Sequence, residues 1–255
     1  MPFATCRLSV VAVRREPDLI SEITSQARGG ETAEILEERG QWWRVRLLTD
    51  DYEGWVNGRQ FAARTETAPA AATVFTDDLC GIASHDDLQI ALPLCAPLPD
   101  FKDGKFTLGG TEWTWPGATH RVPAGPPDKA ALLAYARRFL HAPYLWGGRT
   151  VFGIDCSGFV QSVMAAFGVR LPRDSKMQAT QGREVASRAE AVPGDLMFFG
   201  SAALGIYHVG LLLPCNEILH ASTMVRVDDI TDEGIQNRET GEMSHHTVAI
   251  RRVLD

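Results

Sequence analysis

The chain has 255 residues and is 45% hydrophobic, so it is long enough to bury more than one core. Lys and Arg total 25 against 32 Asp and Glu, a formal charge of −7 without any basic block, which argues against nucleic acid as a partner. No apolar run approaches the length of a membrane-spanning helix, and we expect no membrane partner.

The five cysteines are odd in number, widely spaced and without a Cys-x-x-Cys pair: Cys6, Cys80, Cys95, Cys156 and Cys215. This usage favours reduced thiols. The first residues lack the charged region and the apolar region of an export signal. We therefore expect a cytoplasmic protein, although a chain from which a leader had been removed would look the same.

Residues 1–65 are predicted to form a small all-β barrel. Short apolar runs at 8–13, 32–36, 42–47 and 54–56 alternate with turn residues and show little helical periodicity. The pattern Ser21-Glu-Ile-Thr-Ser-Gln26, then Gly30-Glu31, Gln41-Trp-Trp43 and Tyr52-Glu-Gly-Trp-Val56 resembles a bacterial SH3-like domain.

Residues 66–127 begin with linker composition and then turn apolar. Predicted strands at 88–92, 105–108 and 112–115 surround a proline-rich bend. This region resembles a second, degenerate SH3-like barrel.

Residues 128–255 are predicted to hold helices first and a sheet after them. Asp128 is a cap residue before a helix at about 129–140, and Asp155 precedes a second amphipathic helix that Gly168 ends. Strands are predicted at 197–199, 208–213, 218–222, 225–227 and 248–250, with a polar loop at 228–246. The order indicates an α+β arrangement.

Cys156 lies in the first turn of the second predicted helix. Unpaired backbone N–H groups and the positive end of the helix dipole favour the thiolate there, so we expect a reactive cysteine. The alternative is a small apolar residue that packs the start of a helix.

The residues around Cys156 form a recognisable motif. Pro143-Tyr-Leu-Trp-Gly-Gly148 followed by Asp155-Cys-Ser-Gly-Phe159 resembles the nucleophile motif of the NlpC-type cell-wall peptidases, a papain-like cysteine peptidase family. Further elements follow in the family's order: Leu171-Pro-Arg-Asp-Ser175, Pro193-Gly-Asp-Leu-Met-Phe-Phe199, Tyr207-His-Val-Gly-Leu211 and Ile218-Leu-His-Ala-Ser222. The resemblance implies two SH3-like barrels followed by an α+β papain-like peptidase domain at 128–255.

A thiolate nucleophile requires a general base and a third group that orients the base. If the turn at 214–217 has a three-residue loop, His220 pairs opposite Gly210, and His208 and His220 share one face of the sheet. A one-residue slip would place the two rings on opposite faces. The resemblance implies that His208 is the base and His220 the orienting residue, whereas the alternative is a pair of structural histidines.

The resemblance also assigns roles around the nucleophile. Tyr144 is implied as an oxyanion donor or substrate-positioning group, with a core aromatic as the alternative. Asp155, Ser157 and Ser175 match positions that hold a D-glutamyl group. Asp155 could instead serve only as a helix cap, and Ser175 could be only a surface hydroxyl.

Relatives with two SH3-like modules and no leader use the first module to close one end of the substrate cleft. Glu22 and Tyr52 match those positions, and their alternative is an ordinary exposed polar residue. The pair His245-His246 suggests a metal site, but adjacent histidines point apart and no Cys or carboxylate spacing supports zinc. We expect no metal and no cofactor.

The resemblance therefore implies a γ-D-glutamyl-L-diamino acid endopeptidase that acts on murein tripeptides or tetrapeptides with a free N-terminal L-Ala, in the recycling of cell-wall peptides. One alternative is a wall-binding SH3-like protein with an inactive peptidase domain. Another is an amidase or acyltransferase that uses the same Cys/His site. The preferred diamino acid, the length of stem peptide and the oligomeric state stay open.

Overall fold

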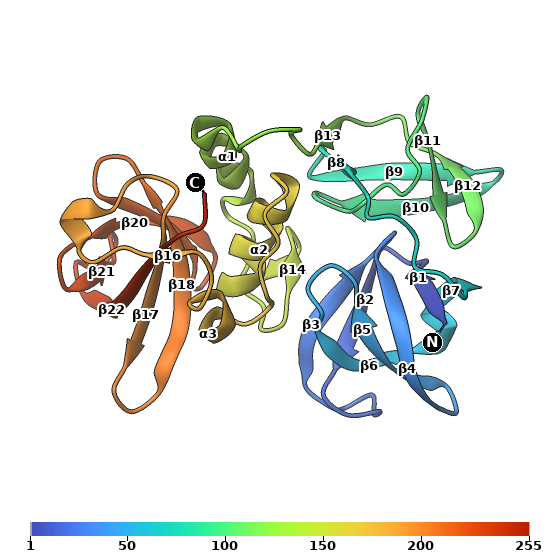
Figure 1. The fold of residues 1–255 in the computed structure, drawn as a ribbon, viewed down its shortest axis with the longest axis horizontal. Helices are drawn as coiled ribbons and strands as arrows, with labels where there is room; N and C mark the ends of the chain where they lie inside the picture. Colours follow the sequence, from blue (N-terminus) through green and yellow to red (C-terminus); the bar gives the residue numbers. More distant parts are fainter. Residues whose placement is uncertain (1, 255) are drawn as a thin grey trace. The chain divides into compact units, whose positions relative to one another are not determined.

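The computed structural model describes residues 2–254, apart from the side chains of residues 63 and 64. The chain forms two compact units (Figure 1). The first comprises Met1–Val122 and Trp146–Val151, and the second comprises Pro123–Leu145 and Phe152–Asp255. Within the described residues, no helix has the length and apolar character needed to cross a membrane.

The first sheet of the N-terminal unit has seven strands in the order β3-β2-β6-β5-β4-β1-β7. All four runs predicted as strands are confirmed, and the pattern missed β1, β3 and β7. The alternating apolar residues of these strands form one buried core, which includes Val11, Val13 and Val45. The elements are β1 Phe3–Cys6, β2 Val10–Arg14, β3 Ile23–Arg28, β4 Thr32–Arg39, β5 Trp42–Leu47, β6 Glu53–Asn57, the 3₁₀ helix Gly58–Gln60 and β7 Phe61–Thr65.

The rest of the N-terminal unit has a four-stranded sheet, β10-β9-β12-β11, and a separate pair, β13-β8. It has a core of its own, built on Leu92, Phe106 and Trp115. All three predicted strands are confirmed, whereas the assignment of this region to a second SH3-like barrel stays a prediction. The strands are β8 Val74–Thr76, β9 Cys80–His85, β10 Leu88–Pro93, β11 Lys105–Leu108, β12 Thr111–Thr114 and β13 Thr119–Arg121.

The helices of the second unit begin at the predicted cap residues. The Asp128 side chain accepts a hydrogen bond from the backbone N–H of Ala130 at 2.9 Å, and Asp155 accepts one from Gly158 at 2.7 Å. The elements are α1 Lys129–Ala136, the 3₁₀ helix Arg137–Phe139, α2 Cys156–Ala166, α3 Ser175–Gln178 and the 3₁₀ helix Arg188–Glu190. Two short strands precede α2: β14 Arg149–Thr150, which belongs to the N-terminal unit, and β15 Gly153–Ile154.

The sheet of the second unit has seven strands in the order β16-β22-β17-β18-β19-β20-β21. Because β21 pairs with β22 as well as with β20, the sheet closes on itself around a core that includes Met197, Phe199 and Ile218. The strands are β16 Arg183–Glu184, β17 Leu196–Ser201, β18 Gly205–Leu213, β19 Glu217–Ala221, β20 Val225–Ile230, β21 Gly234–Gln236 and β22 Met243–Arg252.

The predicted loop at 228–246 is wrong. Strand β20 continues to Ile230, β21 lies inside the range, and β22 begins at Met243. The polar composition was misleading because Asp228 is a buried strand residue whose carboxylate is bonded to His220 of the neighbouring strand and to Arg226 of its own strand, so tertiary pairing overrides its low strand propensity. The papain-like α+β class stays a prediction.

Candidate active site

Cys156 is the first residue of α2, and its side chain is buried. Backbone groups at Ser157 and at Val209, the residue after His208, are close enough to its sulfur to lower the pKa of the thiol. The start of α2 and strand β18 therefore meet at the thiol, as a Cys/His site requires.

The expectation that the helix terminus favours the thiolate is not met in the resting site. Burial raises the pKa of the Cys156 thiol to about 12, and the Asp155 carboxylate raises it further, while the backbone group at Val209 acts in the opposite direction. Burial also lowers the pKa of His208 well below its usual value, and His220 and His245 act in the same direction. The sulfur and the imidazole thus both rest uncharged, and a proton must move at the moment of attack.

The two predicted histidines lie on adjacent strands in the predicted register. His220 of β19 pairs with Gly210 of β18, which places it on the same face as His208. A Cβ at Gly210 would lie 2.8 Å from the side chain of Ile218 and 3.0 Å from the Cβ of His220, so glycine permits the close packing of β19 on β18 beside the histidines. Nε2 of His208 lies 2.8 Å from Nδ1 of His220, which is hydrogen-bonding distance.

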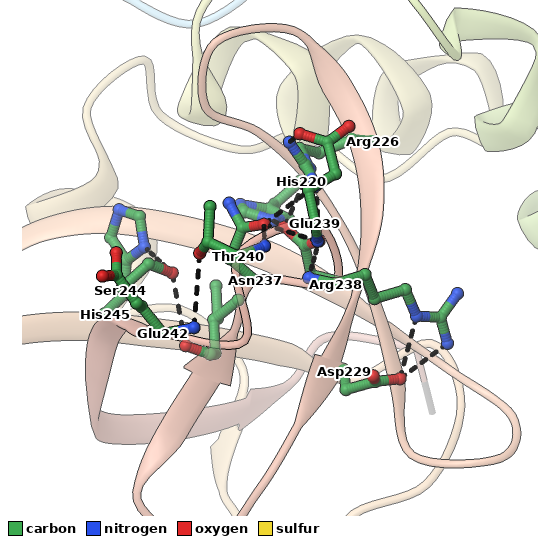
Figure 2. Close-up of polar contacts among 12 residues, drawn as sticks. His220, Arg226, Asp229, Asn237, Arg238, Glu239, Thr240, Glu242, Ser244 and His245 are labelled. Atoms are coloured by element: carbon green, nitrogen blue, oxygen red, sulfur yellow. Dashed lines mark hydrogen bonds and ion pairs between the residues drawn. The ribbon is translucent and has the colours of Figure 1, made fainter.

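A carboxylate extends this pair. Nε2 of His220 lies 3.0 Å from Oδ2 of Asp228, while Oδ1 of Asp228 accepts from Nη2 of Arg226 and from the backbone N–H of Arg238, each at 3.0 Å. Burial alone would raise the pKa of Asp228, but the bonds from His220 and Arg238 lower it to about 2. The sequence interpretation missed Asp228 because it placed the residue in a loop. Figure 2 shows His220 with Arg226 and Arg238.

His245 lies against the base. Its ring stacks on His208 with centroids 4.2 Å apart and an angle of 25° between the planes. Burial lowers the pKa of His245 to about 4, and His220 acts in the same direction. The sequence interpretation considered this histidine only as a metal ligand. In the part of the chain that the structure describes, no group of three or more His, Cys, Asp or Glu side chains is arranged to hold a metal ion.

Tyr144 is held beside the nucleophile by its backbone. Its N–H donates to the carbonyl of Thr223 at 3.0 Å, and it forms a bridge to Ile154, two residues before Cys156. Burial, followed by the nearby Cys156 and Asp155, raises the pKa of its phenol to about 12. The hydroxyl therefore keeps its proton at neutral pH and can donate a hydrogen bond.

Asp155, Ser157 and Ser175 are all buried, and an arginine that the sequence interpretation left without a role joins two of them. Nη1 of Arg173 donates to Asp155 Oδ1 at 3.0 Å and to Ser157 Oγ at 2.8 Å. Arg173 is only 2% exposed, so Asp155 is an ion-pair partner as well as a helix cap. Arg173 belongs to the Leu171–Ser175 motif, which was the available signal. Ser175 begins α3 and is not a surface hydroxyl.

Glu22 and Tyr52 lie in the N-terminal unit. The Glu22 carboxylate accepts from the indole Nε1 of Trp146 at 2.8 Å and pairs with Arg15 at 2.7 Å. Gly147 follows with φ +79°, and a Cβ there would lie 2.5 Å from the carbonyl oxygen of Ile23, so only glycine fits. Tyr52 is half-buried against the core of the first sheet.

Residues near Glu22 form a buried ion cluster of Arg28, Glu31 and Arg149. Glu31 accepts from Nη2 of Arg28 at 2.8 Å and from Nη1 of Arg149 at 2.9 Å, and all three side chains are buried. Arg149 also donates to the carbonyl of Gln26 at 2.7 Å. The sequence interpretation missed this cluster, since Arg149 is 118 residues away from Glu31 in the chain.

Two family models match the sequence. Residues 141–252 match the NlpC/P60 family, and residues 13–61 match the bacterial dipeptidyl-peptidase SH3 domain. The first match contains Cys156, His208 and His220, and the second covers most of the first sheet. The prediction of an SH3-like domain within residues 1–65 is therefore confirmed.

Relatives of similar organisation match most of the chain. A Bacillus subtilis (strain 168) protein named gamma-D-glutamyl-L-lysine dipeptidyl-peptidase is 45% identical over 219 residues, 78% of this chain and 72% of that protein. A Bacillus cereus protein of the same name is 25% identical over 239 residues, 82% of this chain and 70% of that one. A crystal structure of an NlpC/P60 family protein from Bacillus cereus ATCC 10987 covers 99% of this chain and 100% of its own with a TM-score of 0.82; at 20% identity it shows the fold alone. The chain thus belongs to the NlpC/P60 family of cysteine peptidases and carries a bacterial dipeptidyl-peptidase SH3 domain before its peptidase domain.

Proposed function

We propose that this peptidase hydrolyses the bond between the γ-carboxyl of D-glutamate and an L-diamino acid in small murein peptides, tripeptides or tetrapeptides, with a free N-terminal L-Ala. The observation that carries the proposal is the buried His208–His220 pair, which adjoins Val209, the residue whose backbone acts on the sulfur of Cys156. It occurs in a chain 45% identical to a relative named for γ-D-glutamyl-L-lysine cleavage.

In the acylation step, His208 takes the thiol proton while the sulfur attacks the γ-carbonyl carbon of D-glutamate. Because Nε2 of His208 is bonded to His220, Nδ1 is the nitrogen left to receive that proton. The C–N bond then breaks, and His208 returns the proton to the leaving amine of the diamino acid. The product is a thioester between Cys156 and the D-glutamyl group.

In the deacylation step, water attacks the thioester, and His208 accepts a proton from the water. The C–S bond breaks, and the proton passes to the sulfur, which restores the thiol and the neutral imidazole. Tyr144 supports both steps because its phenol stays protonated and can donate a hydrogen bond to the negative oxygen of each tetrahedral intermediate.

We assign the D-glutamyl group to the buried surface around Arg173. A γ-linked D-glutamate keeps its α-carboxylate free, and the hydroxyl of Ser175 is a suitable donor to a carboxylate. The hydroxyl of Ser157 donates to Asp155 Oδ1 at 3.2 Å and would turn from it to donate to the substrate. Asp155 acts here through Arg173, since their ion pair fixes the guanidinium and the Ser157 hydroxyl in place. Ordered donors of this kind favour one orientation of the peptide.

We assign the free amine of L-Ala to Glu22, with Tyr52 adding a hydrogen bond. The support is the placement of Glu22, whose carboxylate accepts from Trp146, two residues after Tyr144 in the chain. The carboxylate also pairs with the exposed Arg15, and an ammonium group would compete with that exposed ion pair at little cost. A role in recycling follows, because intact cell wall offers no free amine at this position. Recycling of small peptides would take place in the cytoplasm.

Incubation of the protein with L-Ala-γ-D-Glu-meso-diaminopimelate, with product masses followed over time, tests the proposal. We expect L-Ala-D-Glu and free diaminopimelate, and the L-lysine analogue tests the preference for the diamino acid. The N-acetylated tripeptide is the matched control and should be a poor substrate. No cleavage of either peptide would favour a wall-binding protein with an inactive peptidase domain. Loss of ammonia, or transfer to an added amine, would favour an amidase or an acyltransferase.

A further inference from the structure

We propose that Asp228 is a positioning residue that fixes the proton arrangement of the imidazole chain, defined as His208, His220 and Asp228. Through His220 it makes Nδ1 of His208 the basic nitrogen. The inference rests on the proposed function for its kinetic consequence, but its first readout does not depend on any substrate.

When both imidazoles are neutral, the hydrogen bonds of the chain permit one arrangement of protons. Asp228 is a carboxylate at neutral pH and can only accept, so Nε2 of His220 must carry a hydrogen. Neutral His220 then has a lone pair on Nδ1, which accepts from Nε2–H of His208 at 2.8 Å. The single proton of neutral His208 is thereby placed on Nε2. Its Nδ1 is left free to take the thiol proton.

The surroundings of Asp228 hold it in this role. The residue is 1% exposed, and its other oxygen is occupied by Arg226 and by the backbone of Arg238. Arg226 is itself bonded to Glu239 and to Asn237 (Figure 2). The carboxylate therefore cannot turn away from His220 without losing several bonds.

This geometry predicts an unusual order of severity for two substitutions. In Asp228→Asn, two donors form hydrogen bonds at the position of Oδ1, whereas Nε of Arg226 lies 3.0 Å from Oδ2 without forming a hydrogen bond. The amide oxygen is therefore placed at Oδ1, and the NH₂ group faces Nε2 of His220. An NH₂ group can only donate, so His220 shifts its hydrogen to Nδ1, and His208 is left with its hydrogen on Nδ1 and no basic nitrogen toward the sulfur. In Asp228→Ala, water can enter and accept from His220, so part of the population keeps the active arrangement.

The first experiment measures the protonation of the ring nitrogens by ¹⁵N NMR in histidine-labelled Cys156→Ala protein, which removes any effect of turnover. In the Cys156→Ala protein, we expect His208 and His220 to be neutral, each with its hydrogen on Nε2. In the double variant Cys156→Ala/Asp228→Asn, we expect both histidines to carry the hydrogen on Nδ1. A spectrum with hydrogen on Nδ1 of His220 in protein that retains Asp228 would overturn the inference, whatever the protein hydrolyses.

The second experiment compares kinetics on the free tripeptide. We expect Asp228→Asn to lower kcat by about 10³- to 10⁴-fold, as a wrong tautomer does in other triads. Asp228→Ala should lower kcat by about 10- to 100-fold, and KM should change little in both. The control is Asp229→Asn, at a neighbouring half-exposed carboxylate that pairs with the side chain of Arg238. It should alter kcat less than about 3-fold.

The outcomes distinguish failure of the positioning role of Asp228 from failure of the proposed function. Expected tautomers with no cleavage of any γ-D-glutamyl peptide would leave the positioning role intact and sink the proposed function. Cleavage by wild type, with Asp228→Asn as active as wild type or more active than Asp228→Ala, would sink the positioning role alone. Thermal unfolding of each variant shows whether it folds, and the isosteric Asn side chain keeps the test valid if the Ala variant does not.

Discussion

The imidazole chain and the buried ion cluster of Arg28, Glu31 and Arg149 are both almost inaccessible to water, yet their chemistry differs. In the ion cluster, two arginines hold a carboxylate, and Arg149 and Arg28 lower the pKa of Glu31 even though burial alone would raise it. Its charges are fixed across the ordinary pH range. In the imidazole chain, by contrast, hydrogen-bonded ring nitrogens can pass a proton from one to another. A buried polar network is suited to catalysis when its protons can move, and to architecture when they cannot.

Replacement of the nucleophile should give the largest difference between an effect on activity and an effect on stability. Cys156→Ala removes the sulfur on which the imidazole chain acts, so kcat should fall by about 10⁵- to 10⁶-fold. The free energy of unfolding should change by less than about 1 kcal/mol, because a small side chain at the start of a helix contributes little packing. The measurements are tripeptide hydrolysis and urea unfolding. Retention of more than a tenth of the activity would show that another group is the nucleophile.

Replacement of His208 should lower kcat more than replacement of His220. His208→Gln removes the group that exchanges protons with the sulfur and should lower kcat about 10⁴-fold, whereas His220→Gln removes only orientation and should lower it about 10²-fold. The same order should appear in the rate at which iodoacetamide alkylates Cys156. This rate is measured in a Cys80→Ser/Cys215→Ser background, because those two thiols are exposed. Equal activity of the two variants would point to a different base.

Glu31→Gln should show the opposite signature from Cys156→Ala. The substitution leaves two buried guanidinium groups without their carboxylate, which should lower the free energy of unfolding by about 3–5 kcal/mol. The activity per folded molecule should change less than about 10-fold. Urea unfolding and kinetics on the same sample test this, with Glu37→Gln, at a half-buried carboxylate of the same unit that pairs with Arg39, as the control. A loss of activity without a loss of stability would contradict the architectural role of the ion cluster.

Glu22 offers an exposed carboxylate for comparison with the buried Glu31. If it binds the ammonium of L-Ala, Glu22→Gln should remove a charge-assisted bond of about 1.5–3 kcal/mol and lower kcat/KM on the free tripeptide about 10- to 100-fold. Activity on the N-acetylated peptide should stay nearly the same, so the ratio between the two peptides should narrow. Stability should not change measurably. An unchanged ratio would remove the main support for recycling.

The smallest effect concerns pH. Because the pKa of His245 lies at about 4 in the folded chain, below its usual 6.5, the unfolded chain takes up the proton first as the pH falls. The contribution of neutral His245 to the free energy of unfolding is fully present above pH 6.5 and is lost as the pH falls toward 4. The lowered pKa of His208 has an effect in the same direction. His245→Phe should reduce the loss between pH 7 and pH 5 by about 1 kcal/mol after solvent screening. His246→Phe, an exposed neighbour, is the control for urea unfolding at the two pH values.

The sequence predicted those parts of the site that local pattern determines. The cap at Asp155, the helix that starts at Cys156 and the register of His208 and His220 follow from spacing over at most about twelve residues. The residues that were missed lie in segments whose strands the sequence did not predict in full. Asp228 reaches His220 because β20 pairs with β19, and His245 reaches His208 because β22 and β18 both pair with β17. The polar context of both residues favours a loop when each segment is considered alone.

The segment Trp146–Val151 determines where the chain can be divided into folded fragments. The segment belongs to the N-terminal unit although Tyr144 and Cys156 on either side belong to the other, so the chain crosses between the units three times. A fragment that starts at residue 123 would carry Arg149 away from Glu31 and Gln26, its buried partners. The peptidase domain therefore cannot be separated from the N-terminal unit without removing the ion-pair partner of Arg149. A fusion of this domain to a different N-terminal domain requires a carboxylate that pairs with Arg149.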